Sequence, residues 1–283
     1  MCDDPKMTAR PAHFTPIDAD RVQPTQFAQS LWGEDHLNGP AVVGLAAHAL
    51  EAAFGLPDFL PARLTVDLFR AARGVPTTTE VKLVRDGRRV RNSECDVVQD
   101  GVTVAHATLV QYRLAEPPPG EEWFRTTDFV PPEAVDTGLA PYINSDGVGW
   151  TRAIADHQNA GRKRYVNRAI DVIEGHANSP FVRAAVTAEG TSLVTNLGTA
   201  GVGYINGDLT VALSRLPRDE WVGAEAETHW AAGGIAVGAT TLYDSAGPIG
   251  TGLITAVSNP GAQIDFGHIR FPDRIRRDAS PAF

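Results

Sequence analysis

One segment occurs twice in this chain of 283 residues, and the repeat limits the folds that the chain can adopt. Residues 64–70 read LTVDLFR, and 145 residues later residues 209–215 read LTVALSR. Five of the seven residues are identical. The elements that we predict around the two copies also correspond, so a duplication explains the match better than chance does. We therefore expect two related folding units.

An apolar helix precedes the first copy, and a run of strands follows it. Residues 40–54 carry apolar side chains on almost every face, which indicates a buried helix. Gly44, His48 and Glu51 form a polar stripe on it, which we expect to face a loop or the exposed end of the helix. After the copy, Asp-Gly pairs separate alternating segments, and this pattern is a strong hairpin signal. The predicted strands are residues 80–85, 91–99 and 102–113.

The second copy has the same surroundings. Asn178, Ser179 and Pro180 offer an N-cap and a first-turn proline to a helix that we expect to run to about Asn196. The predicted strands that follow are residues 204–214, 221–230, 235–243 and 249–257. A helix this apolar is best buried when the antiparallel sheet curls around it. The predicted fold class is α+β, a double hot-dog in which two helix-wrapped sheets pair within one chain.

A proline-rich linker separates the two units. Residues 114–122 contain three consecutive prolines, which favour an extended spacer. The predicted domains are an N-terminal hot-dog of residues 1–117 and a C-terminal hot-dog of residues 118–283. Residues 1–25 are polar and rich in proline, so the first expected ordered element is residues 27–31. Residues 123–147 show little periodicity and are interpreted as a wrapping segment before the second unit begins near Val148.

Charge and cysteine content narrow the classes of function. The net charge of −9 argues against nonspecific nucleic-acid binding and against attraction to anionic membranes. Cys2 and Cys95 cannot form a disulfide framework, and the N-terminus lacks the apolar stretch of a signal peptide. We expect a cytoplasmic protein. Two arginine-rich clusters, residues 85–91 and 162–168, are either solvated edge residues or a seat for an anionic ligand such as a nucleotide diphosphate.

Three polar residues near the second copy are candidates for catalysis. The sequence contains no metal-ligand spacing, phosphate loop, complete dinucleotide fingerprint or nucleophile elbow. Asp208 stands immediately before the second copy, where the first copy has Arg63. This asymmetry is expected when a duplication leaves only one of two related sites catalytic. The alternative is a strand-entry Asp that accepts hydrogen bonds from nearby backbone donors.

The other two candidates are Thr228 and Glu189. Thr228 lies on the strand after Asp208, and antiparallel pairing would place its hydroxyl beside that carboxylate, where the two groups could hold one water for base-assisted hydrolysis. Its alternative role is that of a strand-forming threonine. Glu189 lies inside the second helix, so its carboxylate needs a partner or a cavity if a sheet wraps that helix. An exposed face of the helix is the alternative.

With these positions in place, the chain resembles the acyl-CoA thioesterase II type of double hot-dog protein, and especially its actinobacterial members. The resemblance extends from about residue 25 to residue 258. It rests on the order of several motifs, which are residues 32–44, 64–70, 85–87, 206–211 and 215–221. It implies that water hydrolyses a fatty acyl-CoA thioester to free acid and CoA in the second hot-dog. CoA is part of the substrate, and no separate cofactor is implied.

The resemblance also implies a catalytic set of an Asp, a Thr and a Gln. Asp208 matches the Asp within one position and would be the general base, while Thr228 matches the Thr, with His229 as the alternative, and would orient the water. The Gln has no match, because Ile254 or Thr255 stands on the last strand. Either Thr255 or Glu189 would have to compensate for the missing amide, whose loss typically costs on the order of 100- to 1000-fold in rate.

The missing Gln leaves alternatives open. One is a non-catalytic protein that binds an acyl group or CoA without hydrolysing it. A second is a hot-dog hydratase or dehydratase, although residues 33–39 do not match the motif of that class. Hot-dog units commonly assemble further, so we also expect a homo-oligomer.

Overall fold

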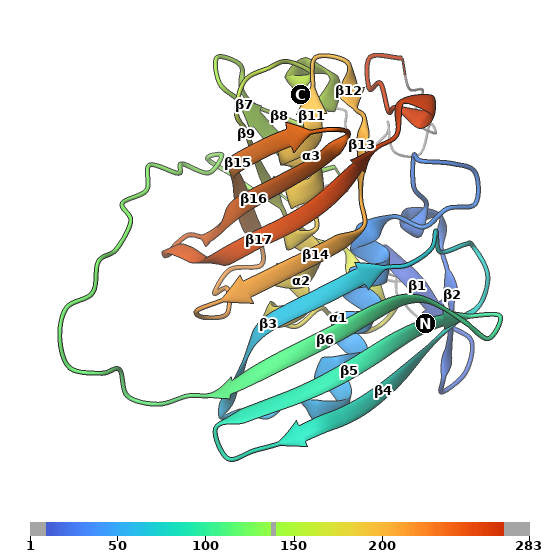
Figure 1. Ribbon diagram of the computed structural model, residues 1–283, viewed down its shortest axis with the longest axis vertical. Helices are drawn as coiled ribbons and strands as arrows, with labels where there is room; N and C mark the ends of the chain where they lie inside the picture. Colours follow the sequence, from blue (N-terminus) through green and yellow to red (C-terminus); the bar gives the residue numbers. More distant parts are fainter. Residues whose placement is uncertain (1–9, 137–139, 269–283) are drawn as a thin grey trace, which may run out of the picture.

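The computed structural model describes residues 10–136 and 140–268, and its two halves repeat one arrangement of a helix and a meander (Figure 1). The first half contains β1 (Ala12–Pro16), β2 (Arg21–Pro24), η1 (Gln26–Ala28), α1 (Gly39–Phe54), β3 (Phe59–Leu68), β4 (Thr77–Asp86), β5 (Val90–Gln99) and β6 (Val102–Arg113). The second half begins with β7 (Tyr142–Ser145), β8 (Gly149–Thr151), η2 (Ile154–His157), β9 (Lys163–Asn167) and β10 (Asp171–Ile173). It continues with α2 (Pro180–Ala188), α3 (Thr191–Asn196), β11 (Leu197–Gly198), β12 (Gly201–Val202), β13 (Tyr204–Asn206), β14 (Asp208–Leu213), β15 (Val222–Ala232), β16 (Ile235–Asp244), β17 (Gly247–Ser258) and η3 (Pro260–Ala262).

The two copies of the repeated segment join the halves. β3 and β14 pair antiparallel at the centre of a 15-stranded sheet whose main path is β10-β1-β2-β4-β5-β6-β3-β14-β17-β16-β15-β9-β7-β8. Thr65 lies directly opposite Thr210, its equivalent 145 residues later, and their hydroxyl oxygens are 3.0 Å apart. Each copy therefore satisfies the backbone groups of the other, and neither is left as an open sheet edge.

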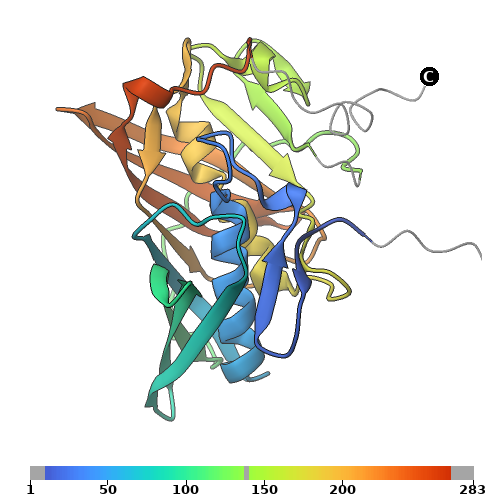
Figure 2. The ribbon, with the colours of Figure 1, turned by 90° about the vertical axis from the view of Figure 1, so that its right-hand side faces the viewer.

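The helices lie side by side against one face of the sheet (Figure 2). Gly44 permits this contact, because a Cβ at that position would lie 2.8 Å from Cγ2 of Val186 on α2 and 2.7 Å from Cγ2 of Val172. Buried apolar residues of α1, α2 and both meanders form one continuous core. Of the polar stripe of α1, Gly44 packs against α2. His48 stacks on His176, and Glu51 accepts a hydrogen bond from Ser179, both in the loop between β10 and α2, so the prediction that the stripe faces a loop is confirmed for these two residues.

The hairpin predictions agree with the strands. β4, β5 and β6 contain the three predicted segments of the first half, and β15, β16 and β17 contain most of the corresponding segments of the second. The Asp100-Gly101 and Gly233-Gly234 turns have positive φ at both residues, as a tight two-residue hairpin requires. The predicted fold class, α+β with two tandem hot-dog units, is confirmed.

Three sequence predictions about elements were wrong. β1 and β2 precede the element expected to be first, and β1 is held by a short parallel pairing with β10 of the other half. β7 begins at Tyr142, ahead of the predicted start near Val148. The second helix is broken into α2 and α3 at Glu189 and Gly190, where a Cβ on the glycine would lie 2.7 Å from the Tyr165 ring.

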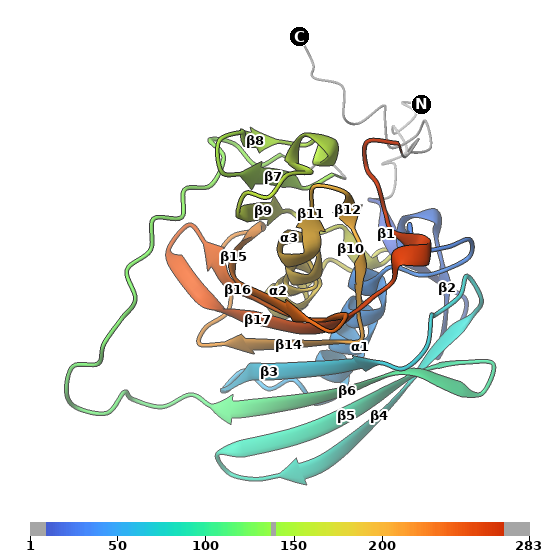
Figure 3. The ribbon, with the colours of Figure 1, turned by 45° about the horizontal axis from the view of Figure 1, so that its top comes forward.

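The segment that links the halves has no helix or strand over residues 114–136 and arches away from the body of the molecule (Figure 3). Toward its C-terminal end, the segment contacts the second half through Phe129, whose ring stacks on the ring of Tyr243 with centroids 4.3 Å apart. Among the described residues, no helix is long and apolar enough to cross a membrane.

Candidate active site

Two cavities border the second hot-dog. The first, which we call the inter-half cavity, has a volume of about 410 Å³ and is lined by residues 36–40, 68–72 and 205–207 together with Glu189, Ser192, Val257 and Phe266, among others. The second, which we call the α3 cavity, has a volume of about 680 Å³ and is lined by residues 159–163, 194–201 and 226–229 together with Tyr204 and Gln263, among others. Both volumes lie in the range of small-molecule sites.

Glu189 provides the only carboxyl group on the wall of the inter-half cavity. Glu189 is the C-cap residue of α2, at the break between α2 and α3, and it is 9% exposed. Burial raises the pKa of the Glu189 carboxyl to about 7, and a hydrogen bond from Asn206 opposes that shift. A carboxyl group with such a pKa exchanges protons readily near neutral pH. The predicted alternative of an exposed helix face was wrong.

The carboxyl group of Glu189 lies against the first residue of α1, which belongs to the other half. A Cβ built on Gly39 would lie 2.0 Å from Oε1 of Glu189, so any larger residue requires the carboxyl group or the helix end to move. The N-cap Asn38 accepts a hydrogen bond from Ala41 N–H at 2.9 Å, and Pro40 has no N–H. The positive end of the α1 dipole therefore points at the same place as the Glu189 carboxyl group.

Asn206 is a site residue that the sequence reasoning missed. It is the last residue of β13, and Gly207 separates it from β14. Its Nδ2 donates to Oε1 of Glu189 at 3.3 Å and to the carbonyl oxygen of Asp208 at 3.3 Å. The signal that could have found it was its position two residues before Asp208, with Gly207 between them, because β13 and β14 both pair antiparallel with β17 and their registers differ by one residue.

Asp208 lines neither of the two cavities. It begins β14 on the face of the sheet opposite the one on which Leu209 is buried. Its Oδ1 accepts from the Thr255 N–H at 3.0 Å, and its Oδ2 accepts from the Thr255 hydroxyl. Thr255 therefore occupies the last-strand position beside Asp208, as the resemblance implies for the missing Gln, while Ile254 is fully buried on the other face.

Thr228 is not beside Asp208, so the predicted pairing was wrong. β14 and β15 are separated by β17 and β16, and the register across these strands runs from Thr210 through Leu253 and Ala239 to Thr228. Three strand spacings amount to about 14 Å, too far for the two side chains to hold one water. The sequence placed the two residues on consecutive strands of the chain, but the last strand of the meander folds back between them.

Comparison with known proteins identifies the family. Residues 28–112 match the model of the acyl-CoA thioesterase N-terminal domain, and residues 113–253 match the model of the acyl-CoA thioesterase C-terminal domain. This chain belongs to the acyl-CoA thioesterase family. A search among curated proteins gave no match.

Solved structures of other proteins show the same fold. A provisionally assigned thioesterase from Novosphingobium aromaticivorans has a TM-score of 0.65 and 17% identity, over 87% of this chain and 98% of that chain. A provisionally assigned thioesterase II from Thermobifida fusca has a TM-score of 0.64 and 14% identity, over 87% and 95%. The acyl-CoA thioesterase II from Mycobacterium marinum has a TM-score of 0.57 and 15% identity, over 87% and 94%.

The side chains of the second arginine-rich cluster already have protein partners. Arg164 donates to Glu225 at 2.7 Å and to Asp146 at 2.8 Å, and Arg162 donates to Glu227 at 3.1 Å. Lys163 donates to two backbone carbonyl groups. These pairs favour the structural interpretation of the cluster over an anion seat. Within the described part of the chain, no group of three His, Cys, Asp or Glu side chains could hold a metal ion.

Proposed function

We propose that this protein hydrolyses an acyl-CoA thioester in the inter-half cavity and that Glu189 is the general base. The observation that supports this proposal is a buried carboxyl group with a pKa of about 7 on the wall of a cavity between the two halves. A general base works best when its pKa is near the working pH, because it is then both largely ionised and able to hold a proton.

In the proposed reaction, the Glu189 carboxylate takes a proton from water as the water oxygen attacks the thioester carbonyl carbon. The carbonyl oxygen then carries a negative charge. Collapse of this intermediate breaks the carbon–sulfur bond, and the proton on Glu189 passes to the leaving CoA sulfur. The products are a free acid and CoA, and Glu189 returns to its ionised form.

The N-terminus of α1 and the Asn206 amide are placed to stabilise the oxyanion. Pro40 has no N–H and Ala41 N–H donates to Asn38, so the end of α1 acts through its dipole, which favours negative charge there. Asn206 Nδ2 donates to Glu189 and to the Asp208 carbonyl oxygen, so it reaches the oxyanion by exchanging one of these acceptors for it. Donors fixed in this way are typically worth on the order of 100- to 1000-fold in rate for each donor.

Apolar residues provide part of the wall of the inter-half cavity, including Val42, Leu68, Ile205, Val257 and Phe266. This lining suits the hydrocarbon part of an acyl group, because burial of apolar surface is the main source of its binding energy. The cavity thus combines apolar surface with the Glu189 carboxyl group, and His36 and Arg70 also line it.

The experiment compares the two candidate bases. Thiol release from acyl-CoA substrates of increasing chain length is measured for the wild type, Glu189→Gln and Asp208→Asn, with thermal unfolding to confirm the fold. We expect Glu189→Gln to lose about 100- to 10,000-fold in kcat and Asp208→Asn to stay within about threefold of the wild type.

The opposite result would return the role of base to Asp208, as the family resemblance implies. Tight binding of every acyl-CoA by the wild type without thiol release would instead support the non-catalytic alternative.

A further inference from the structure

The α3 cavity lies on the other side of a shared wall from the inter-half cavity. Gly201, Gly203 and Tyr204 line the α3 cavity, whereas Val202, Ile205 and Asn206 line the inter-half cavity. Along α3, Ser192 and Leu193 face the inter-half cavity, and the residues from Val194 onward line the α3 cavity. The proposed hydrolysis uses no group of the α3 cavity.

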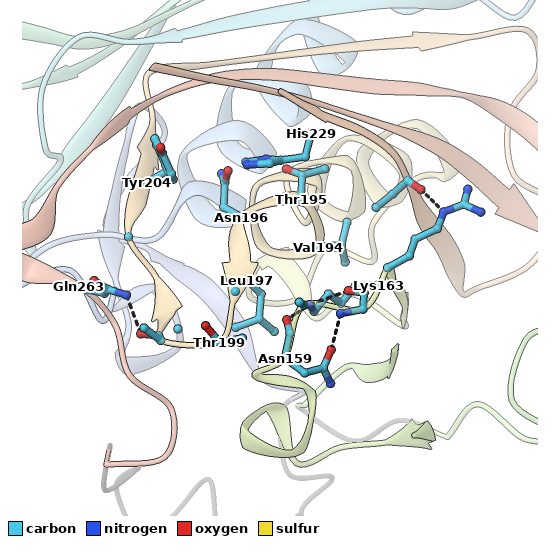
Figure 4. A pocket seen from close by; sticks show the side chains of 18 of the residues that line it. Asn159, Lys163, Val194, Thr195, Asn196, Leu197, Thr199, Tyr204, His229 and Gln263 are labelled. Atoms are coloured by element: carbon cyan, nitrogen blue, oxygen red, sulfur yellow. Dashed lines mark hydrogen bonds between the residues drawn. The ribbon is translucent and has the colours of Figure 1, made fainter. Parts of the chain in front are cut away.

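Asn196, the last residue of α3, has an unsatisfied amide on the wall of this cavity (Figure 4). The residue is 6% exposed, and neither Oδ1 nor Nδ2 has a hydrogen-bond partner within the described residues. A buried amide without partners destabilises the folded state, so such a group in a cavity indicates a missing ligand. The ligand must supply one donor and one acceptor side by side, because the amide offers one acceptor and a pair of donors at its tip.

Two aromatic rings line the same cavity as Asn196. Tyr204 and His229 form an edge-to-face pair with centroids 6.1 Å apart and an angle of 71° between the rings. Figure 4 shows the His229 ring and the Asn196 amide directed toward the same part of the cavity. Rings in this position offer a stacking surface for a flat ligand, and histidine and tyrosine both stack on nucleobases.

The charged side chains of the α3 cavity do not favour an anionic ligand. Arg162 and Lys163 are held by protein acceptors, and Glu227 adds a negative charge to the lining. The lining also includes uncharged polar side chains such as Thr199, Thr228 and Gln263, beside the neutral amide of Asn196 and the two aromatic rings. A neutral, planar ligand with a donor and an acceptor on one edge fits this set.

We propose that the α3 cavity binds an adenine ring, with Asn196 pairing to its edge and Tyr204 or His229 against its face. An asparagine amide matches adenine with two hydrogen bonds, because Oδ1 accepts from the exocyclic amine while Nδ2 donates to the adjacent ring nitrogen. The cavity of about 680 Å³ is large enough for a nucleoside. The adenine can come from the CoA of the proposed reaction or from a free nucleoside, and the experiment below separates these sources.

The first test is calorimetric titration with adenosine and with purine riboside, which lacks the exocyclic amine. We expect adenosine to bind about tenfold or more tightly than purine riboside, since one of the two hydrogen bonds is lost. Asn196→Leu should weaken adenosine binding by about tenfold or more while its melting temperature stays equal or rises, because the unsatisfied amide is gone. Equal binding of both nucleosides, binding of neither, or unchanged binding by Asn196→Leu would overturn the proposal.

A matched control is Gln111→Met on β6. Gln111 is 2% exposed, its Oε1 also lacks a partner within the described residues, and it lines neither cavity. This variant also removes an unsatisfied buried amide, so a general effect on stability should appear in it as well. Adenosine binding should not change.

The source of the adenine is read from substrate kinetics. If the cavity holds the adenine of CoA, Asn196→Leu should raise the KM for an acyl-CoA by about tenfold and leave the KM for the same acyl group on pantetheine unchanged. If the ligand is a free nucleoside, neither KM should change although adenosine binding is lost. The titrations need no turnover, so they remain decisive even where Glu189 proves not to be the base.

Discussion

The N-termini of α1 and α2 have the same construction but different surroundings. Each helix starts after an N-cap side chain, Asn38 for α1 and Ser179 for α2, with a proline in the first turn. Each N-terminus also meets a glutamate from the other helix or its end, Glu189 at α1 and Glu51 at α2. The two ends are thus related versions of one arrangement.

The difference lies in what surrounds each glutamate. Burial raises the pKa of the Glu51 carboxyl group, and the hydrogen bond that it accepts from the Ser179 hydroxyl opposes that shift. Neither residue lines the inter-half cavity or the α3 cavity. Glu189 lines the inter-half cavity, and its carboxyl group lies against Gly39. Burial raises the pKa of this carboxyl group to about 7. Comparison of the two ends indicates that open space beside the carboxyl group distinguishes the proposed active end from its structural counterpart.

The largest expected effect separates the two glutamates by activity. Glu189→Gln should lower kcat/KM for an acyl-CoA by about 100- to 10,000-fold, because the base that activates water is lost. Glu51→Gln should keep kcat/KM within about threefold of the wild type. Steady-state thiol release under identical conditions provides the measurement, and equal losses in the two variants would break the comparison.

The next effect is a change of stability with pH. The folded-state pKa of Glu189 lies above its ordinary value of 4.5, so its stabilising contribution is complete below pH 4.5 and is lost as pH rises through about 7. Glu189→Gln should match the wild type near pH 4.5 and exceed its free energy of unfolding by up to about 3 kcal/mol above pH 8. Urea unfolding across this pH range measures the difference. A constant difference would show that the Glu189 carboxyl group does not titrate within that range.

A smaller effect is expected when Gly39, which precedes Pro40 at the start of α1, is replaced by serine, the residue that precedes Pro180 at the start of α2. Gly39→Ser places a Cβ where the Glu189 carboxyl group now lies, so either that group or the helix must move. We expect a loss of about 1 to 3 kcal/mol in the free energy of unfolding, as overpacking typically costs, and at least about a tenfold loss in kcat. Retained activity in this variant would show that contact between Glu189 and the helix end is not needed.

The smallest effect concerns the cap at α2. Ser179→Ala removes the side chain that accepts from Val182 N–H and donates to Glu51, so the free energy of unfolding should fall by about 1 kcal/mol. Because this end has no part in the proposed reaction, kcat and KM should stay unchanged. A fall in kcat in this variant would show that the N-terminus of α2 also takes part in the reaction.

The sequence predicted the fold well because its signals are local or repeated. The Asp-Gly and Gly-Gly turns mark the hairpins, and the repeated segment predicted two related units. That the two copies pair with each other as β3 and β14 was not predicted. β1 escaped prediction because it is short and depends on β10, which lies far away in the chain. The break at Gly190 depends on the ring of Tyr165 and has no signal of its own in the helix.

The site was only partly predictable from the sequence. Glu189 could be singled out as a carboxylate on a helix that a sheet should wrap, and the structure buries it beside a cavity. Thr228 was expected beside Asp208 because their strands follow each other in the chain, but strand order in a meander depends on which edge the last strand joins. Asn206 was missed because its contact with Glu189, 17 residues earlier, depends on how β13 packs beside the break between α2 and α3.

The hydrogen bond between Thr65 and Thr210 has a consequence for how this molecule can change. In an assembly of two identical chains, one substitution at the symmetry axis would alter both sides of the contact at once. Here each side is encoded separately, so a mutation changes a single partner while the other keeps its role. Because both halves belong to one chain, one half can change in sequence while the other keeps the structure of the contact.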